Sequence, residues 1–564
     1  MGSMPGQIDV SVFSYATMVI RFLLPALAII IIVRCLRSLL FEKGQEENWG
    51  WLSLPNGSRI YLKHWENVIG RAESSDVYLE YPTLSRTHAA LIRDDKGNWK
   101  VFDVVSKAGV SVNGTKTDDK DGLPIKSGDI LSLGEVNLVF FSEEKSIDTE
   151  GAMPRAHAEG QTHPHGATKQ RNTLIFLTEF QLLLGLQLCI SRGEDLKAVL
   201  PLAFLSLIAL TWICYIVTRE LKIASFEVET LAFFLTTLGL SVTAVSGENE
   251  LFRFLGLLLA GICLFFGIGW LLSDLNRAKR LRLPVAVAGL LLLGANMLFS
   301  RSIYGARRWL EFGGISFQPS EFVKIALIFA GAATLDRLFA RKHLLSFIAF
   351  AGACVIALAL INDFGSALIF FVTYLIIAFL RSGDFATIFL SVGGAGFAGF
   401  LAIQFRSHIA ARFSTWGHAW EFVDGRGYQQ TRAMSAAASG GFFGVGAGNG
   451  WFHSVFAADS DLVFALISEE LGLIIALSII AVLVGFVVFS VKKAGEARSS
   501  FYLIGACAAS SILLFQALLN VLGSVDIIPF TGVTLPFVSR GGSSLMACWG
   551  LLAFIKALRG VRGY

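Results

Sequence analysis

Acidic residues beside long apolar runs are the first candidates for chemistry in this sequence. Asp363 follows one such run and Asp461 precedes another, with Glu469 and Glu470 two turns further along. If one helix starts at Asp461, then Asp461 and Glu469 share a face of it. Burial disfavours the charged form of a carboxyl group and raises its pKa, which suits a general base near neutral pH. We therefore expect acid–base chemistry at Asp461, and either a functional role or a helix cap at Asp363.

A second group combines cations with an aromatic side chain and lies between two apolar runs. Glu321 and Lys324 are three residues apart, so they share one face of a helix that starts near Pro319. Arginines and a lysine in one external cleft would fit a pyrophosphate; a membrane-interface anchor with one local ion pair is the alternative. The group consists of Arg307, Arg308, Trp309, Gln318, Glu321 and Lys324.

Glycine-rich segments at membrane depth form a third group. Irregular backbone there must be buried in protein or line a cavity, and clustered glycines let a backbone approach a ligand closely. Ser539, Gly541 and Gly542 are therefore candidate substrate contacts, together with Glu470. Residues 439–446 indicate either part of the same cavity or a packed re-entrant turn.

A different chemistry is indicated by residues 47–142, where short alternating strands and turns predict a small β-sandwich. Three motifs follow in order: Gly70-Arg71, Ser85-Arg86-Thr87-His88 and Asn113-Gly114. This order resembles the forkhead-associated (FHA) family. The resemblance implies a phosphothreonine site at Arg71, Ser85 and Arg86, because arginine offers a bidentate fork and serine a further donor to phosphate. His88 is expected in the core. Ala108 stands where the family usually has a peptide-holding asparagine, so a scaffold or intramolecular docking role is the alternative.

Membrane spans are the elements that must position the other groups. The chain has 564 residues, 54% of them hydrophobic and only 16% charged, whereas soluble proteins are nearer a quarter charged. One apolar span covers residues 9–40, residues 143–172 are too polar to bury a core and are expected to be disordered, and about twelve spans fill residues 173–564. The predicted fold class is a polytopic α-helical membrane protein, with about twelve core spans plus one N-terminal span and a small cytosolic all-β sandwich.

Charge and cysteine usage narrow the class and orient the chain. The net charge of +4 is too small to indicate nucleic-acid binding, and seven scattered cysteines without CxxC spacing indicate neither a disulfide framework nor a zinc site. No cleavable signal peptide is expected. Basic residues gather in alternate loops, so the positive-inside rule places the N-terminus outside and the β-sandwich and C-terminus in the cytosol. The three polar groups then share the outer face.

As an ordered set, these segments resemble the SEDS family of shape, elongation, division and sporulation proteins, over roughly residues 173–558. The segments are RRWLEFGGISFQPSEFVK, NDFGSA, GYQQTRAMSAAASGGFFGVGAGNG, DLVFALISEELG and PFTGVTLPFVSRGGSS. The resemblance implies a peptidoglycan glycosyltransferase in the bacterial cytoplasmic membrane that polymerises lipid II, with a class B penicillin-binding transpeptidase as partner. It implies that Asp461 is the base, acting directly or through a divalent cation such as Mg²⁺ or Mn²⁺. Arg308 and Lys324 would stabilise the departing pyrophosphate, and Asp363 would position one of them or a metal.

The chain departs from the family pattern at three points. Ala457 and Asp459 lie in the stretch where the family usually has Pro-Glu, Arg540 interrupts the SYGGS-like motif, and the spans before Arg307 are more numerous. Two other functions stay open beside the enzyme: a lipid II translocase, and a non-catalytic scaffold that recruits a phosphorylated division protein. A translocase needs acids along a path through both leaflets, whereas the acids here gather at one face, which favours the enzyme.

Overall fold

The computed structural model describes most of the chain. The described residues are 10–41, 48–142 except 74, 95–96, 105 and 118–121, 164–192, 199–300 except 222 and 224, 308–333 except 313–314, and 340–558 except 383–384 and 406. Arg307 and residues 143–163 of the expected linker lie outside them. Residues 164–172 were expected in that linker but are helical, because the next helix already begins at Pro164. Its Gln170 donates to a carboxylate oxygen of Glu227 at 3.3 Å.

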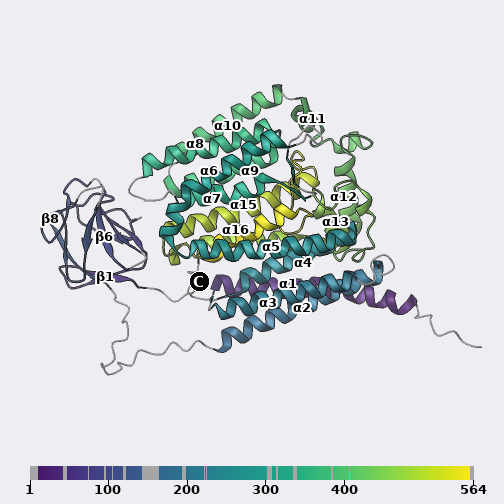
Figure 1. Cartoon of the computed structure of the whole chain (residues 1–564), viewed down its shortest axis with the longest axis horizontal. Helices are drawn as coiled ribbons and strands as arrows, with labels where there is room; N and C mark the ends of the chain where they lie inside the picture. Colours follow the sequence, from purple (N-terminus) through teal and green to yellow (C-terminus); the bar gives the residue numbers. More distant parts are fainter. Residues whose placement is uncertain are drawn as a thin grey trace, which may run out of the picture.

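Sixteen α-helices in the described residues form a helical block beside a β-sandwich (Figure 1). They are α1 Val10–Phe41, α2 Pro164–Arg192, α3 Val199–Glu220, α4 Glu227–Thr243, α5 Glu248–Leu272, α6 Leu275–Phe299, α7 Pro319–Ala333, α8 Ala340–Leu360, α9 Phe364–Ser382, α10 Phe385–Phe405, α11 Ser407–Thr415, α12 Tyr428–Gly440, α13 Val463–Glu470, α14 Leu473–Lys492, α15 Ser500–Ser524 and α16 Gly542–Ala557. The β-sandwich lies at one end of the block, and α11, α12 and α13 lie at the other (Figure 1).

Nine helices among the described residues are long and apolar enough to cross a membrane, and two shorter apolar helices cover Leu345–Leu360 and Gly542–Ala557. The predicted span at Asp461 is wrong in one respect. The helix there ends at Glu470, Gly472 adopts φ +90°, and the long apolar helix begins only at Leu473. Left-handed backbone of this kind favours glycine, so the chain turns before it crosses the block. Asp461 itself precedes the first residue of α13 and therefore shares no helix face with Glu469.

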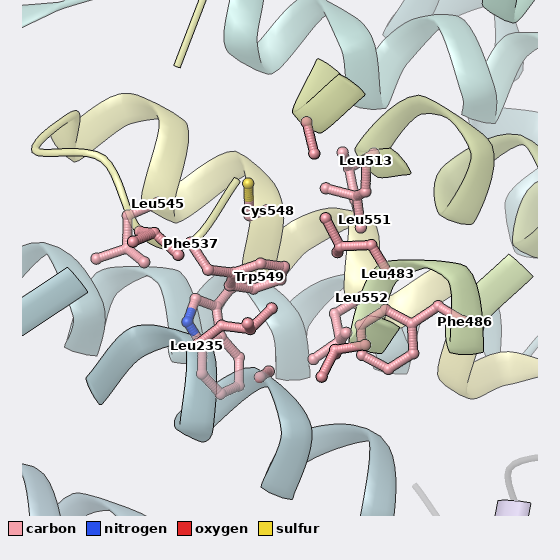
Figure 2. Close-up of a cluster of buried hydrophobic side chains, with 14 of the residues drawn as sticks. Leu235, Leu483, Phe486, Leu513, Phe537, Leu545, Cys548, Trp549, Leu551 and Leu552 are labelled. Carbon is pink, nitrogen blue, oxygen red and sulfur yellow. The ribbon is translucent and has the colours of Figure 1, made fainter. Parts of the chain in front are cut away.

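The centre of the helical block is formed by α4, α5, α14, α15 and α16. Figure 2 shows Trp549 of α16 against Leu235 of α4 and Phe537. Trp549 is fully buried, and its ring meets those of Phe233 and Phe265 edge-on, at centroid distances of 4.9 and 6.0 Å. Such edge-to-face pairs add to the free energy of burial. This dense apolar centre holds the ends of its helices, and hence the polar groups there, in fixed positions.

Eleven strands in the described residues build the sandwich from two sheets, ordered β2-β1-β11-β10-β7-β8 and β4-β3-β5-β6-β9. They are β1 Gly50–Ser53, β2 Arg59–Leu62, β3 Glu66–Gly70, β4 Val77–Tyr78, β5 Ala89–Arg93, β6 Trp99–Asp103, β7 Val110–Val112, β8 Thr115–Lys116, β9 Leu123–Ile125, β10 Ile130–Leu133 and β11 Val136–Ser142. A short hairpin of β12 Leu310–Phe312 and β13 Ile315–Phe317 precedes α7. Sequence analysis did not predict this hairpin, which carries Arg308 at its entrance.

Candidate active site at one end of the helical block

Three segments far apart in the sequence bring one arginine and two carboxylates together. Arg308 enters the β12–β13 hairpin, Asp363 precedes α9, and Asp461 precedes α13. The Arg308 Nε lies 3.4 Å from Asp363 Oδ1, and its Nη1 donates to the Gly532 carbonyl at 3.2 Å. A methyl group built on Gly532 would lie 3.2 Å from Asp461 Oδ2 and 3.8 Å from Arg308 Nη1. The two acids and the arginine therefore lie around Gly532, where a side chain would crowd Asp461 and the left-handed backbone (φ +64°) favours glycine.

Asp461 is positioned through its main-chain carbonyl group, and the Ser460 side chain interacts with its carboxylate. Asn520 of α15 donates from Nδ2 to the Asp461 carbonyl at 2.8 Å and to the Val533 carbonyl at 2.7 Å. Burial raises the pKa of Asp461 above the usual aspartate value, and the positive charges of Arg308 and Arg412 oppose that rise. Such a carboxylate is a stronger base than an ordinary aspartate, and the cations beside it can stabilise negative charge.

Asp363 is buried and has partners on both sides. Gln318 donates from Nε2 to Asp363 Oδ2 at 3.4 Å and to Ser320 Oγ at 3.0 Å. The Asp363 Oδ1 also accepts from the Ser366 backbone N–H at 3.4 Å, which is a helix-cap contact at the start of α9. The cap and the ion pair with Arg308 thus coexist, and Gln318 fixes the carboxylate between them.

Lys324 lies deeper than expected for a direct anion ligand. Its side chain is 3% exposed, its Nζ lies 2.6 Å from Glu321 Oε2, and it donates to Gln516 Oε1 at 2.7 Å. Gln516 in turn donates to the Thr534 hydroxyl at 3.0 Å. The expected pair on one face of α7 is present. It joins α7 to α15 and to residues 525–541, so in this conformation Lys324 supports the pocket from behind.

Two departures from the family pattern contact each other. Arg540 Nη1 lies 3.0 Å from Asp459 Oδ2, and the Arg540 backbone N–H donates to the Asp459 carbonyl at 2.8 Å. Ser246 also donates to Asp459 Oδ2 at 2.7 Å. Ser539 donates to the Ser460 carbonyl and accepts from the Leu535 backbone N–H. Together these bonds fix the turn that presents Asp461.

Glu469 and Glu470 do not join Asp461 but bind the glycine-rich loop. Both carboxylates accept from backbone N–H groups of the glycine-rich loop: Glu469 from Trp451 and Phe452, and Glu470 from Gly448 at 3.0 Å. Burial raises the pKa of Glu470 to about 7, while the hydrogen bond from the Gly448 backbone and the charge of Arg192 oppose that rise. The residues 439–446 are packed as the re-entrant turn of the second interpretation, since a methyl group on Gly440 would lie 1.9 Å from the Ser468 carbonyl oxygen. The contacts of Glu470 therefore indicate that its side chain holds the glycine-rich loop in position.

The remaining predicted substrate contacts are one half-buried aromatic residue and two closely packed glycines. Trp309 is half-buried directly after Arg308. A methyl group on Gly542 would lie 2.3 Å from a Leu257 side-chain carbon, so this glycine allows α16 to pack on α5. A methyl group on Gly541 would lie 3.3 Å from the Ser544 side chain. These two glycines thus shape the backbone near the pocket by close packing.

Sequence analysis missed two pocket residues that had a recognisable signal. Gln516 and Asn520 are both at most 2% exposed and lie four residues apart on α15. Polar side chains at this spacing on an apolar helix share one face, and polar groups inside a membrane are usually functional. Arg412 is a further cation that the sequence motifs did not single out, and its charge acts on both carboxylates.

The phosphothreonine motifs of the sandwich lie together at one end of it. Arg71 and Arg86 are exposed, and the backbone N–H of Arg71 donates to the Ser85 carbonyl at 3.0 Å. The Ser85 hydroxyl accepts from the Lys107 backbone N–H at 3.1 Å, which leaves its own hydrogen free to donate. His88 is fully buried, as expected, with one ring nitrogen bonded to the Ser85 backbone N–H and the other close to the Gly109 carbonyl.

In the described part of the chain, no three His, Cys, Asp or Glu side chains gather as a metal-binding cluster. Mg²⁺ often uses only one or two carboxylates together with substrate phosphates. Asp363 and Asp461 are the two carboxylates of the site that could contribute to such an arrangement, with the Arg308 guanidinium beside them.

Comparison with known proteins gives matches to both parts of the chain. The model of the cell cycle protein family FtsW/RodA/SpoVE matches residues 204–561, and the FHA domain model matches residues 67–134. The peptidoglycan glycosyltransferase RodA of Mycobacterium tuberculosis (strain ATCC 25618 / H37Rv) is 31% identical over 319 residues, which are 53% of this chain and 68% of that protein.

Two further matches agree with these. The probable peptidoglycan glycosyltransferase FtsW of Tolumonas auensis is 31% identical over 335 residues, 56% of this chain and 87% of that protein. A chain from a structure described as "Structural coordination of polymerization and crosslinking by a peptidoglycan synthase complex" aligns with a TM-score of 0.51 at 24% identity. The alignment covers 59% of this chain and 97% of that chain, and it shows a shared fold.

Proposed function

The chain belongs to the cell cycle protein family of FtsW, RodA and SpoVE, and from this premise we propose that it polymerises glycan strands from lipid II in the pocket around Asp461. It is a peptidoglycan glycosyltransferase by its relatives. The observation that supports the proposed site best is the convergence of Arg308, Asp363 and Asp461 from three distant segments.

The proposed reaction follows from the chemistry of those groups. The Asp461 carboxylate takes the proton of the acceptor sugar hydroxyl, and the resulting oxygen attacks the anomeric carbon of the donor. The bond between that carbon and the donor pyrophosphate breaks, and the pyrophosphate leaves on its lipid with the bonding electrons. Arg308, with Arg412 nearby, stabilises the negative charge that develops. Asp363 and Gln318 hold the Arg308 guanidinium in place.

A divalent cation remains part of the proposal. Asp363 and Asp461 would hold Mg²⁺ or Mn²⁺ jointly with the substrate pyrophosphate, and the cation would supply further positive charge there. The proton transfer and the positioning above use side chains of the chain alone.

The test is polymerisation of labelled lipid II by the purified full-length protein. We expect Asp461→Ala to abolish the glycan polymer, because Asp363, the other carboxylate beside Arg308, is already engaged by Arg308, Gln318 and the Ser366 backbone N–H. Glu250→Ala is the matched control: this partly exposed acid pairs with Arg253 and should leave the polymer unchanged. Unchanged polymer in Asp461→Ala would remove the assignment of the base. A protein that moves lipid II between leaflets without making polymer would favour the translocase instead.

We further propose that the FHA domain binds a phosphothreonine segment through Arg71, Ser85 and Arg86. The exposed arginines and the free serine hydrogen are what support this. Phosphothreonine peptides should retain the wild-type protein but not Arg71→Ala. Arg59→Ala is the control, because Arg59 packs over the Trp51 ring elsewhere in the domain. Equal retention of wild type and Arg71→Ala would remove the idea.

A class B penicillin-binding transpeptidase is the proposed membrane partner. The structural match to a peptidoglycan synthase complex supports such an assembly. Co-expression with a transpeptidase should raise the polymerisation rate of the purified protein. An unchanged rate, with no co-purification, would count against this partner.

A further inference from the structure

The FHA domain touches the helical block through a compact contact at the loop between α14 and α15. The Trp65 backbone N–H donates to the Arg498 carbonyl at 2.7 Å, and the His64 Nδ1 lies 2.7 Å from the Ala497 carbonyl oxygen. Both acceptors are main-chain groups of the loop just before α15. One main-chain and one side-chain contact of this length fix the register of the two surfaces.

Aromatic rings and arginines alternate across the same contact. The rings of Trp49 and Trp65 meet edge-on at 5.8 Å, and the Arg93 guanidinium lies 4.4 Å from the centre of the Trp49 ring. Arg498 of the helical block lies over both rings, at 5.7 and 5.9 Å. Cation–π contacts that lose water are among the stronger ones, and Trp65 is only 7% exposed.

One buried acid completes the contact. Glu66 is 8% exposed, accepts from the Ser500 hydroxyl at 3.1 Å, and lies 3.9 Å from the Lys279 Nζ at the start of α6. A buried carboxylate is tolerated only with such partners. We call this contact, made by residues 49, 64–66 and 93 with residues 279 and 497–500, the docking interface.

The docking interface and the phosphothreonine loops lie at opposite ends of the same two strands. Strand β3 begins at Glu66 in the interface and ends at Gly70, next to Arg71. Its antiparallel neighbour β5 begins at Ala89, after the Ser85 loop, and ends at Arg93 in the interface. A five-residue strand is roughly 16 Å long at about 3.3 Å per residue. A bound phosphopeptide therefore need not displace the helical block.

We propose that the FHA domain is a docked phosphothreonine receptor: it stays on the α14–α15 loop while a phosphothreonine segment of another protein occupies its free end. This rests on the phosphothreonine binding proposed above. The recruited protein is then held at a fixed place at the end of the helical block opposite Asp461. An FHA domain that is joined to the helical block only by its linkers would not hold the recruited protein at a fixed position.

Hydrogen exchange on the full-length protein tests the docking, with a degenerate phosphothreonine peptide library and its unphosphorylated twin as probes. We expect the Trp65 amide to exchange at least about tenfold more slowly in the wild type than in the Trp65→Ala/Arg498→Ala double variant at the same position. Arg59→Ala, which breaks an arginine–tryptophan pair outside the interface, should keep the wild-type protection.

Adding the phosphorylated library should leave that protection in place, and the double variant should still be retained on phosphopeptide beads. Deprotection of residue 65 on phosphopeptide binding would overturn the proposal, since the domain would then leave its dock. Fast exchange of Trp65 in the free wild type would also overturn it. Protection without any phosphopeptide retention would instead contradict the phosphothreonine function proposed above, so the two failures are distinguishable.

Discussion

At the scale of single residues, Arg308 acts on both carboxylates of the pocket. It pairs with Asp363 at 3.4 Å and so keeps its own guanidinium in place. It also lowers the pKa of Asp461, while burial raises it. A base that stays protonated cannot act, and a base without neighbouring positive charge would leave the departing pyrophosphate unstabilised. The pocket therefore needs both the burial and the arginine.

The pH dependence of polymerisation should report this balance. Asp461 must be ionised to accept a proton, so the rate falls as the pH drops through its pKa, which lies above the usual aspartate value. Arg308→Gln removes the larger of the two positive influences and should move the acid limb to higher pH, besides lowering the maximal rate. Initial rates measured from acid to alkaline pH give the midpoint.

Arg426 is an exposed arginine just before α12, and it provides the control. The acid limb of Arg426→Gln should coincide with that of the wild type. If the acid limb of Arg308→Gln also coincides with that of the wild type, a group other than Asp461 titrates there.

The contact between Asp459 and Arg540 makes a second prediction at this scale. Asp459→Ala and Arg540→Ala should each slow polymerisation by up to about fivefold, because the side chains are 21% and 41% exposed and such pairs contribute under about 1 kcal/mol. The double variant should be no slower than the worse single variant, since both remove one interaction. Fully multiplicative losses in the double variant would show that the two residues act independently.

At the scale of elements, apolar runs and ordered motifs predicted the fold class, the sandwich and the end of the block where Asp461 and Asp363 meet. They did not predict that α13 ends at Glu470, because a short buried helix and the start of a span have the same composition. Whether Gly472 continues or turns the chain depends on the Phe442 and Gly444 backbones that pack against it. The sequence also did not predict that Lys324 is deeply buried. Its position depends on the hydrogen bond to Gln516, which lies on a helix far away in the sequence.

The buried pair on α7 predicts a large effect on stability. Lys324→Met leaves the Glu321 carboxylate buried without its cation and Gln516 without its donor, which should cost about 3–5 kcal/mol. The thermal midpoint of the detergent-solubilised protein should fall accordingly, and adding Glu321→Gln should recover part of the loss.

The pair Glu250–Arg253 has the same spacing but is exposed, so it is the matched control. Arg253→Met should change the midpoint little, because exposed pairs contribute under about 1 kcal/mol. If Lys324→Met unfolds at the wild-type temperature but makes no polymer, Lys324 contacts substrate directly rather than supporting α7.

At the scale of the whole molecule, α15 connects the two functional ends. Ser500 at its start bonds to Glu66 of the docked FHA domain, and Asn520 near its end holds the Asp461 backbone. From Ser500 to Asn520 the helix rises about 30 Å at 1.5 Å per residue, which is close to the roughly 30 Å thickness of a bilayer's hydrocarbon. We therefore expect the docking interface and the pocket to lie at opposite membrane surfaces.

The distribution of basic residues then indicates which end of the helical block faces the cytosol. The end that carries the FHA domain also holds Arg277, Lys279, Arg280, Lys492 and Lys493. Positive charge at helix ends favours the cytosolic side, so we expect the FHA domain inside and the pocket outside. Lipid II polymerisation at the outer face requires this orientation, and a membrane-impermeant maleimide can test it in intact cells.

Two exposed positions mark the two ends: Asp424, shortly before α12 at the end of the block opposite the sandwich (Figure 1), and Lys116 in β8 of the sandwich. Asp424→Cys should be labelled in intact cells, while Lys116→Cys should react only after permeabilisation. The parent chain sets the background, since among its described cysteines only Cys263 is exposed. Labelling of Lys116→Cys in intact cells would place the FHA domain outside, where a cytosolic kinase could not supply its phosphothreonine partner.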